Sequence, residues 1–148
     1  SLARALALGR SQLERPAMRH TLALILLATP ALAQDWPPEV AAIIDEARTV
    51  CDGTFTAGPE AVTQRDLNGD GTPDWVIDSG TFQCSTSASF YCGTEGCSVD
   101  TIIDGERGSF TLHDWDTETE NGITYLTAPN DSGGTTHFLW GNGEWQIQ

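Results

Sequence analysis

The spacing of apolar residues changes once along this chain, near Gly53, and this change restricts the possible folds more than any other feature. Before Gly53 the apolar side chains recur at intervals of three and four residues, the period of a helix with one buried face. After Gly53 apolar and polar residues alternate, which is typical of half-buried strands. The sequence therefore predicts an α+β fold with a helix over Pro37 to Cys51. The apolar stripe of that helix consists of Val40, Ile43, Ile44, Ala47 and Cys51.

Two turn sequences indicate that the strands are antiparallel. Asn142-Gly143 lies between two alternating segments, and Asn-Gly is the strongest short signal for a hairpin. A two-residue turn at this point places Trp140 directly opposite Trp145. Asp104-Gly105 marks a second turn, whereas residues 81–98 are rich in Ser, Gly and Cys and are expected to form a loop. We therefore expect one N-terminal helix packed on an antiparallel β-meander.

The beginning of the chain has the features of an export signal. Residues 18–33, MRHTLALILLATPALA, combine a positively charged start, an apolar stretch and small residues before Gln34. The apolar stretch is about half of the ~20 residues that a membrane-spanning helix needs. Residues 1–17 precede Met18 and are interpreted as a non-native upstream extension. The predicted organisation is therefore an extension at 1–17, a signal peptide at 18–33, and one mature α+β domain at 34–148, periplasmic or secreted and without membrane insertion.

The mature part is strongly acidic. The whole chain has 7 Arg, no Lys, and 21 Asp and Glu. Four of the Arg and Glu14 precede Gln34, so the mature part keeps 3 basic and 20 acidic residues, a net charge of −17. Nucleic acids and anionic membrane surfaces require a basic face, so this composition argues against both as partners. Cation binding, a basic partner or plain solubility all remain compatible with it, and we expect a monomer.

Four cysteines in an exported chain indicate two disulfides. Cys92 and Cys97 are five residues apart with two glycines between them, so they can close a small loop. This leaves Cys51, at the end of the predicted helix, to pair with Cys84. Zinc sites usually contain two closely spaced pairs of ligands, and the other two cysteines here lie far apart. The sequence therefore favours the pairs Cys51–Cys84 and Cys92–Cys97.

The segment 66–74 carries the clearest chemical motif. It places oxygen-bearing side chains at alternate positions, with Gly71 available for a sharp turn in the middle. Calcium prefers six to eight oxygen ligands around one point, which such a loop can supply. An ordinary polar turn between two strands is the alternative. The predicted calcium ligands are Asp66, Asn68, Asp70, the carbonyl oxygen of Thr72, and Asp74.

The stretch DLNGDGTPDWVID resembles the D-x-[DN]-x-D-G-x-x-D calcium loops of FG-GAP/VCBS-type repeats. It differs from a complete EF-hand loop, because Ile77 stands where an EF-hand has its last Glu. The resemblance covers about fifteen residues and implies a structural calcium role for the five ligands. The wider layout, a signal peptide and a helix ending in Cys followed by an N-G-D-G loop and C-G-x-x-G-C, resembles small periplasmic proteins of proteobacteria. That group has no assigned activity, so the second resemblance implies export and no mechanism.

The sequence leaves three functions open. The first is a non-enzymatic, calcium-stabilised binding or interaction module whose partner is a protein or a small ligand. The second is a periplasmic enzyme inhibitor, comparable in role to a lysozyme inhibitor. The third is a small hydrolase that uses His113 or His137 with a Ser of residues 85–89, although no nucleophile-elbow motif is present. We rank them in this order, and we predict no catalytic residues.

Overall fold

Helix α1 (Pro38–Val50) buries the apolar stripe that the sequence predicts. In the computed structural model, which describes residues 35–87 and 90–148, Val40, Ile43 and Ile44 are almost completely buried. Pro38 occupies the first turn, where its missing N–H has no partner to lose. Glu39 in the same turn complements the positive end of the helix dipole. The helix thus begins and ends within one residue of its predicted bounds.

All strand pairs of the described residues are antiparallel. They form a two-stranded sheet β1-β4, a five-stranded sheet β2-β3-β6-β5 with β7 on β6, and a four-stranded sheet β11-β10-β9-β8. The strands are β1 (Phe55–Ala57), β2 (Val62–Arg65), β3 (Asp74–Asp78), β4 (Phe82–Cys84), β5 (Cys92–Gly93), β6 (Gly96–Ile103), β7 (Glu106–Leu112), β8 (Asp116–Glu120), β9 (Ile123–Pro129), β10 (Thr135–Gly141) and β11 (Glu144–Ile147). A short 3-10 turn, η1 (Ser79–Thr81), precedes β4.

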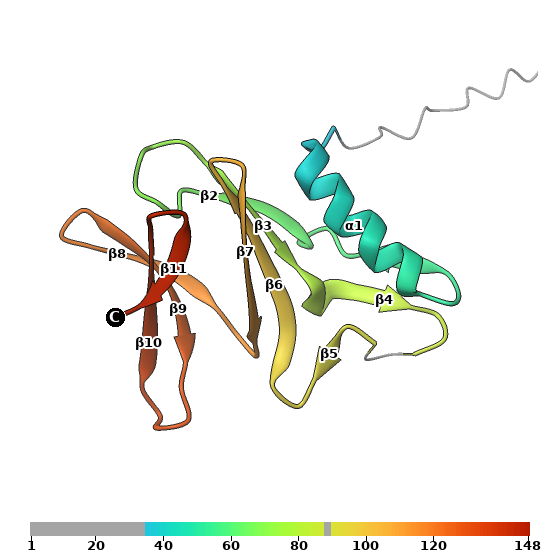
Figure 1. The fold of residues 1–148 in the computed structure, drawn as a ribbon. Coiled ribbons are helices and arrows are strands. Elements are labelled where there is room, and N and C mark those ends of the chain that lie inside the picture. Colours follow the sequence, from blue (N-terminus) through green and yellow to red (C-terminus); the bar gives the residue numbers. More distant parts are fainter. Residues whose placement is uncertain (1–34, 88–89) are drawn as a thin grey trace, which may run out of the picture. The chain divides into compact units, whose positions relative to one another are not determined.

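The five-stranded sheet is covered on both faces, as Figure 1 shows. On one face Ile77 and Ile102 pack with the apolar stripe of α1. On the other face Val76, Val99 and Ile103 pack with aromatic residues that include Trp140 and Trp145 of the four-stranded sheet. Successive side chains of a strand point to opposite faces, so β3 and β6 contribute to both cores. The result is three layers in the order helix, sheet, sheet.

The predicted fold class, α+β with disulfides, is confirmed, but the strands lie in three sheets instead of one meander. After Leu112 the chain leaves the five-stranded sheet and forms β8 to β11 over its second face. Without this cover Val76, Val99 and Ile103 would expose apolar surface. The segment 81–98 is likewise more ordered than a loop, because it contains β4, β5 and the beginning of β6.

The last hairpin has the predicted geometry. Asn142 and Gly143 both have a positive φ, 56° and 78°, as a type I′ turn requires. Trp140 is the direct partner of Trp145 across β10 and β11, and their ring centroids are 5.3 Å apart. Such aromatic cross-strand pairs stabilise a hairpin by roughly 0.2–1 kcal/mol.

Two disulfides connect the elements, and they are the pairs that the spacing predicts. Cys51–Cys84 joins the end of α1 to β4, and both residues are buried. Cys92–Cys97 closes the hairpin between β5 and β6 and is only partly buried. The first bridge therefore attaches the helix to the β-structure, and the second constrains a local turn.

The predicted signal peptide at 18–33 and the extension at 1–17 lie outside the described residues. Among the helices of residues 35–87 and 90–148, none has the length and apolarity needed to cross a membrane.

Candidate functional site

The predicted calcium loop connects β2 to β3, two neighbouring strands of the five-stranded sheet. Leu67 is fully buried in the core between the two sheets and anchors the beginning of the loop. Gly69 and Gly71 have φ values of 77° and 86°, which side chains other than glycine rarely adopt. Glycine at these two positions therefore allows the tight turns of the loop.

The acidic side chains of the loop turn back toward its own backbone. Asp66 accepts hydrogen bonds from the amides of Gly69 at 2.7 Å and Gly71 at 2.9 Å, one on each carboxylate oxygen. Asp70 accepts one from the amide of Thr72 at 2.6 Å, and this bond is the main cause of its lowered pKa. A carboxylate has about four lone-pair positions, so these bonds leave each group with acceptor capacity for a cation.

Asp74 is the buried member of the set. The residue is 6% exposed, and its carboxylate accepts a hydrogen bond from the amide of Leu67 at 2.8 Å. Burial raises the pKa of Asp74 above its usual value, and the negative charges of Asp70, Asp104 and Asp66 raise it further. Asp74 thus lies in a position where a negative charge is unfavourable in the absence of a neighbouring cation.

Asp104 belongs to the same cluster, and the sequence analysis missed it. It lies in the turn between β6 and β7 with a φ of 52°. Its Oδ2 accepts a hydrogen bond of 3.3 Å from Nδ2 of Asn68, which also donates to Asp70 at 3.3 Å. In the sequence, Asp104-Gly105 indicates only a turn, because nothing local shows that this turn lies beside the loop at 66–74.

No basic side chain compensates these charges within the described residues. The ion pairs of residues 35–87 and 90–148 contain none of the five acidic or amide residues of the cluster. In the same part of the chain, no group of three or more His, Cys, Asp and Glu side chains is arranged closely enough to hold a metal ion. The cluster members are Asp66, Asn68, Asp70, Asp74 and Asp104.

The two histidines proposed for hydrolysis lie in different surroundings. His113 is exposed in the segment after β7. His137 lies on β10, with its Nε2 3.4 Å from a carboxylate oxygen of Glu118 and its ring against the edge of Tyr125. Among the described residues, neither histidine forms a hydrogen bond with Ser85 or Ser87. Among the described residues, which do not include Ser89, no histidine–serine pair of the kind that a serine hydrolase needs is present.

No protein-family model matches this chain, and no curated protein or solved structure matches it either. The geometry of its own residues is therefore the basis for the functional argument.

All three arginines of residues 35–148 are paired with carboxylates. Arg48 pairs with Asp45, and Arg65 pairs with Asp116 at 2.8 Å while its guanidinium lies over the ring of Trp115. Arg107 pairs with Asp100 and Glu46. Since these three are the only basic residues beyond Arg19 apart from His, the remaining acidic side chains have no Lys or Arg to pair with.

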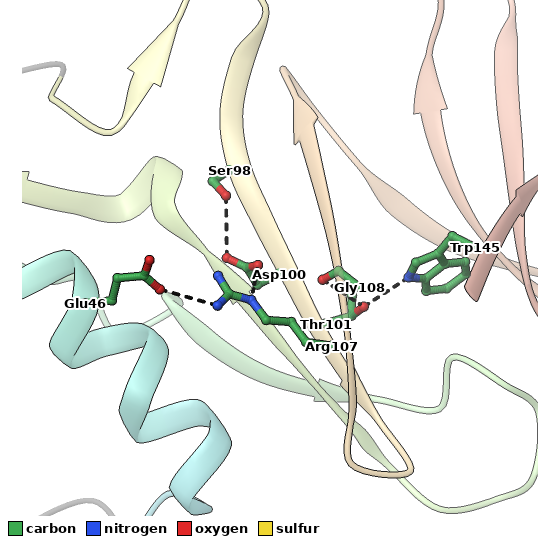
Figure 2. A network of polar contacts seen from close by, with 7 residues as sticks. All are labelled: Glu46, Ser98, Asp100, Thr101, Arg107, Gly108 and Trp145. Carbon is green, nitrogen blue, oxygen red and sulfur yellow. Dashed lines mark hydrogen bonds and ion pairs between the residues drawn. The ribbon is translucent and has the colours of Figure 1, made fainter. Parts of the chain in front are cut away.

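Arg107 connects the helix to the sheet, as Figure 2 shows. Its Nε donates to Asp100 at 2.9 Å, and its Nη1 lies 3.3 Å from a carboxylate oxygen of Glu46 on α1. The side chain of Asp100 is 7% exposed, so its charge depends on this partner. The hydrogen bond to Asp100 is also the main cause of the raised pKa of Arg107. This network is a structural link between layers.

Proposed function

We propose that this chain is an exported, calcium-stabilised interaction domain without catalytic activity. Export is supported by the signal-like segment 18–33 and by two disulfides, which persist in oxidising compartments. Calcium stabilisation is supported by the cluster around the β2–β3 loop. An interaction role is supported by the strongly acidic composition of residues 34–148, which favours binding to a basic partner.

One observation carries the calcium proposal. The buried carboxylate of Asp74 is close enough to Asp66, Asp70 and Asp104 for their charges to raise its pKa, and no Lys or Arg is paired with any of them. The charges of these four carboxylates repel one another, and a cation among them would relieve the repulsion.

The residues present fit calcium in number and chemistry. Calcium takes six to eight oxygens, and it accepts carboxylate, amide and carbonyl oxygens alike. The five predicted ligands together with Asp104 make six oxygen donors. Because Asp104 comes from a different turn, the bound ion would tie the β2–β3 loop to the β6–β7 hairpin. These donors are Asp66, Asn68, Asp70, the carbonyl of Thr72, Asp74 and Asp104.

The test is thermal and urea unfolding of the mature domain in chelator, calcium and magnesium. We expect a dissociation constant in the range of extracellular calcium modules, about 10⁻⁴–10⁻³ M. Calcium at about 10 mM then stabilises the fold by about 1.4–2.7 kcal/mol, which raises the melting temperature by roughly 5 °C or more. Magnesium has a smaller effect, because it demands a tighter octahedral shell.

Two variants with the same change of charge separate ligation from general electrostatics. Asp70→Ala removes a ligand of the loop, and Asp131→Ala removes an exposed carboxylate from the turn between β9 and β10. We expect the calcium effect to disappear in the first variant and to persist in the second. An unchanged melting temperature of the unmodified domain in calcium, together with no heat in a calorimetric titration, would refute the proposal.

A further inference from the structure

A groove of about 400 Å³ opens between β7 and β11, and the proposed calcium site makes no use of it. Its lining combines four aromatic rings with polar side chains, and it lies on the surface of a strongly acidic domain. Ile147 is 74% exposed, the highest exposure of any large apolar side chain in the described residues. An exposed isoleucine beside aromatic rings gives this part of the surface an apolar component that a partner can bury. The lining includes Phe110, Phe138, Trp140, Trp145, Ile147 and Glu144.

Contacts with neighbouring residues fix the aromatic wall of the groove, which consists of Phe110, Phe138, Trp140 and Trp145. Trp145 donates a hydrogen bond from Nε1 to Oγ1 of Thr101 at 3.0 Å (Figure 2). Its ring lies against Gly108 so closely that a Cβ at that position would be 2.6 Å from the indole. The ring centroid of Phe110 is 5.4 Å from that of Trp145 and 4.9 Å from that of Phe138. A wall fixed in this way costs little entropy when a partner binds.

Beside this wall, β11 has a free backbone edge. It is one of the two edge strands of the four-stranded sheet, and β8 is the other. The amide of Gln148 donates to the carbonyl of His137 at 2.9 Å, so this pair is of the hydrogen-bonded type. The types alternate along an antiparallel ladder, and Trp145 and Ile147 therefore belong to pairs whose N–H and C=O groups point away from β10. Among the described residues no strand pairs with this edge.

The negative charge of the domain indicates which kind of partner can bind at the edge of β11. The mature part has 20 acidic and 3 basic residues, and each of those three arginines is already paired. The groove lining contains Glu144 and also Arg107, whose charge is compensated by Asp100 and Glu46. A second copy of this chain would bring the same negative charge to the edge and be repelled. An extended segment with Lys or Arg side chains is complementary, because its alkyl stems pack on aromatic rings while its charges meet carboxylates.

We propose that the edge of β11 and the adjoining aromatic groove bind an extended, basic segment of a partner protein, which adds to the four-stranded sheet as a further strand. Main-chain hydrogen bonds to Trp145 and Ile147 provide the alignment, and the groove receives alternate side chains of the segment. The inference names the partner of the proposed interaction domain and rests on that part of the proposed function. It is independent of calcium, since the groove contains no residue of the 66–74 loop.

The test uses three probes at physiological ionic strength. The first is a short peptide in which lysine alternates with valine and threonine, the second replaces each lysine by glutamate, and the third is a neutral oligosaccharide. Calorimetry measures affinity, and hydrogen exchange locates the site. We expect the lysine peptide alone to bind and to slow exchange of the Trp145 and Ile147 amides. The amides of Glu144 and Gln146 already face β10 and should change little.

Two double variants of identical composition separate the groove from general charge attraction. Ile147→Ser with Glu144→Gln alters the groove, whereas Ile123→Ser with Glu120→Gln alters an exposed pair at the turn between β8 and β9. The groove variant should bind the lysine peptide roughly tenfold more weakly, and the control variant should bind like the unmodified domain. Equal weakening in both variants, binding of the glutamate peptide or the sugar instead, or unchanged exchange at Trp145 and Ile147 would overturn the proposal. Loss of the calcium effect alone would not contradict the proposed binding of a basic segment.

Discussion

The two disulfides should differ strongly in what they contribute to stability. Cys51–Cys84 joins residues 33 apart, and Cys92–Cys97 joins residues 5 apart. In the chain-entropy description a crosslink stabilises the fold by restricting the unfolded chain, and the effect grows with the logarithm of the closed loop. The two loops do not overlap in the sequence, so their contributions should be additive.

The length of each closed loop gives an estimate of the free energy by which its disulfide stabilises the fold. The longer loop corresponds to about 3.7 kcal/mol at 25 °C and the shorter one to about 2 kcal/mol. Replacing the first pair by alanines also removes two buried sulfur atoms, since Cys51 is 8% and Cys84 is 4% exposed. A cavity of about methyl size adds about 1 kcal/mol. We therefore expect a loss of about 4–5 kcal/mol for Cys51→Ala with Cys84→Ala, and about 2 kcal/mol for Cys92→Ala with Cys97→Ala.

The assay is urea unfolding of the mature domain followed by tryptophan fluorescence and circular dichroism. Both double variants are compared with the oxidised and the reduced unmodified domain. The reduced domain should lose about the sum of the two entropic contributions, roughly 6 kcal/mol, which is comparable to the whole stability of many small domains. If the Cys92–Cys97 variant loses as much stability as the Cys51–Cys84 variant, or more, the reasoning from loop length is wrong.

Three further predictions concern single positions and the mature terminus. Gly108→Ala places a Cβ 2.6 Å from the ring of Trp145 and 2.8 Å from Oγ1 of Thr101, so it should cost about 2–4 kcal/mol through overpacking and a weakened hydrogen bond; urea unfolding with unchanged stability would contradict this. Asp116 has a lowered pKa because the amide of Thr117 and the guanidinium of Arg65 stabilise its charged carboxylate. A carboxylate with a lowered pKa stabilises the fold at pH values above its pKa in the unfolded chain, and this stabilisation is lost as the pH falls through its pKa in the folded protein. Asp116→Asn should therefore cost less than about 1 kcal/mol at pH ~7 and nothing at pH ~2, and urea midpoints that show the opposite trend would refute the assignment. Protein expressed from Met18 in a Gram-negative host should be recovered from the periplasm with Gln34 as its first residue, as determined by mass spectrometry; retention of residues 22–33 on the exported protein would contradict the signal-peptide interpretation.

Local patterns were sufficient for several elements. The apolar stripe of Val40, Ile43 and Ile44 predicts α1 almost to its bounds, because helix formation and burial both depend on neighbours three and four residues away. Asn142-Gly143 predicts the last hairpin and the Trp140–Trp145 pair, since the positive φ values of the turn determine the register of the strands beside it.

Strands with weak apolar patterns were not predictable in the same way. β8 contains Asp116, Glu118 and Glu120, and alternating acidic residues do not indicate a buried strand. Its backbone is nevertheless paired along its length with β9, whose Leu126 and Thr127 are buried. Strand formation depends on the partner strand and on burial more than on the intrinsic preference of a segment. The same reason explains why β4 and β5 lie where the sequence predicts a loop.

The sequence by itself determined the elements whose information is local: the helix, the turns, the disulfide pairs, the acidic composition and the oxygen-rich loop at 66–74. Only the tertiary structure determined which residues of distant segments those elements contact. It placed Asp104 beside Asp74 although thirty residues separate them in the sequence, and it placed Trp145 against Gly108 to form the wall of the groove. Contacts of this kind depend on which surfaces of distant segments bury each other. Both faces of the five-stranded sheet are apolar and have to be buried. Strands β8 to β11 bury one of them, and this arrangement depends on packing between distant segments, which no short stretch of sequence encodes.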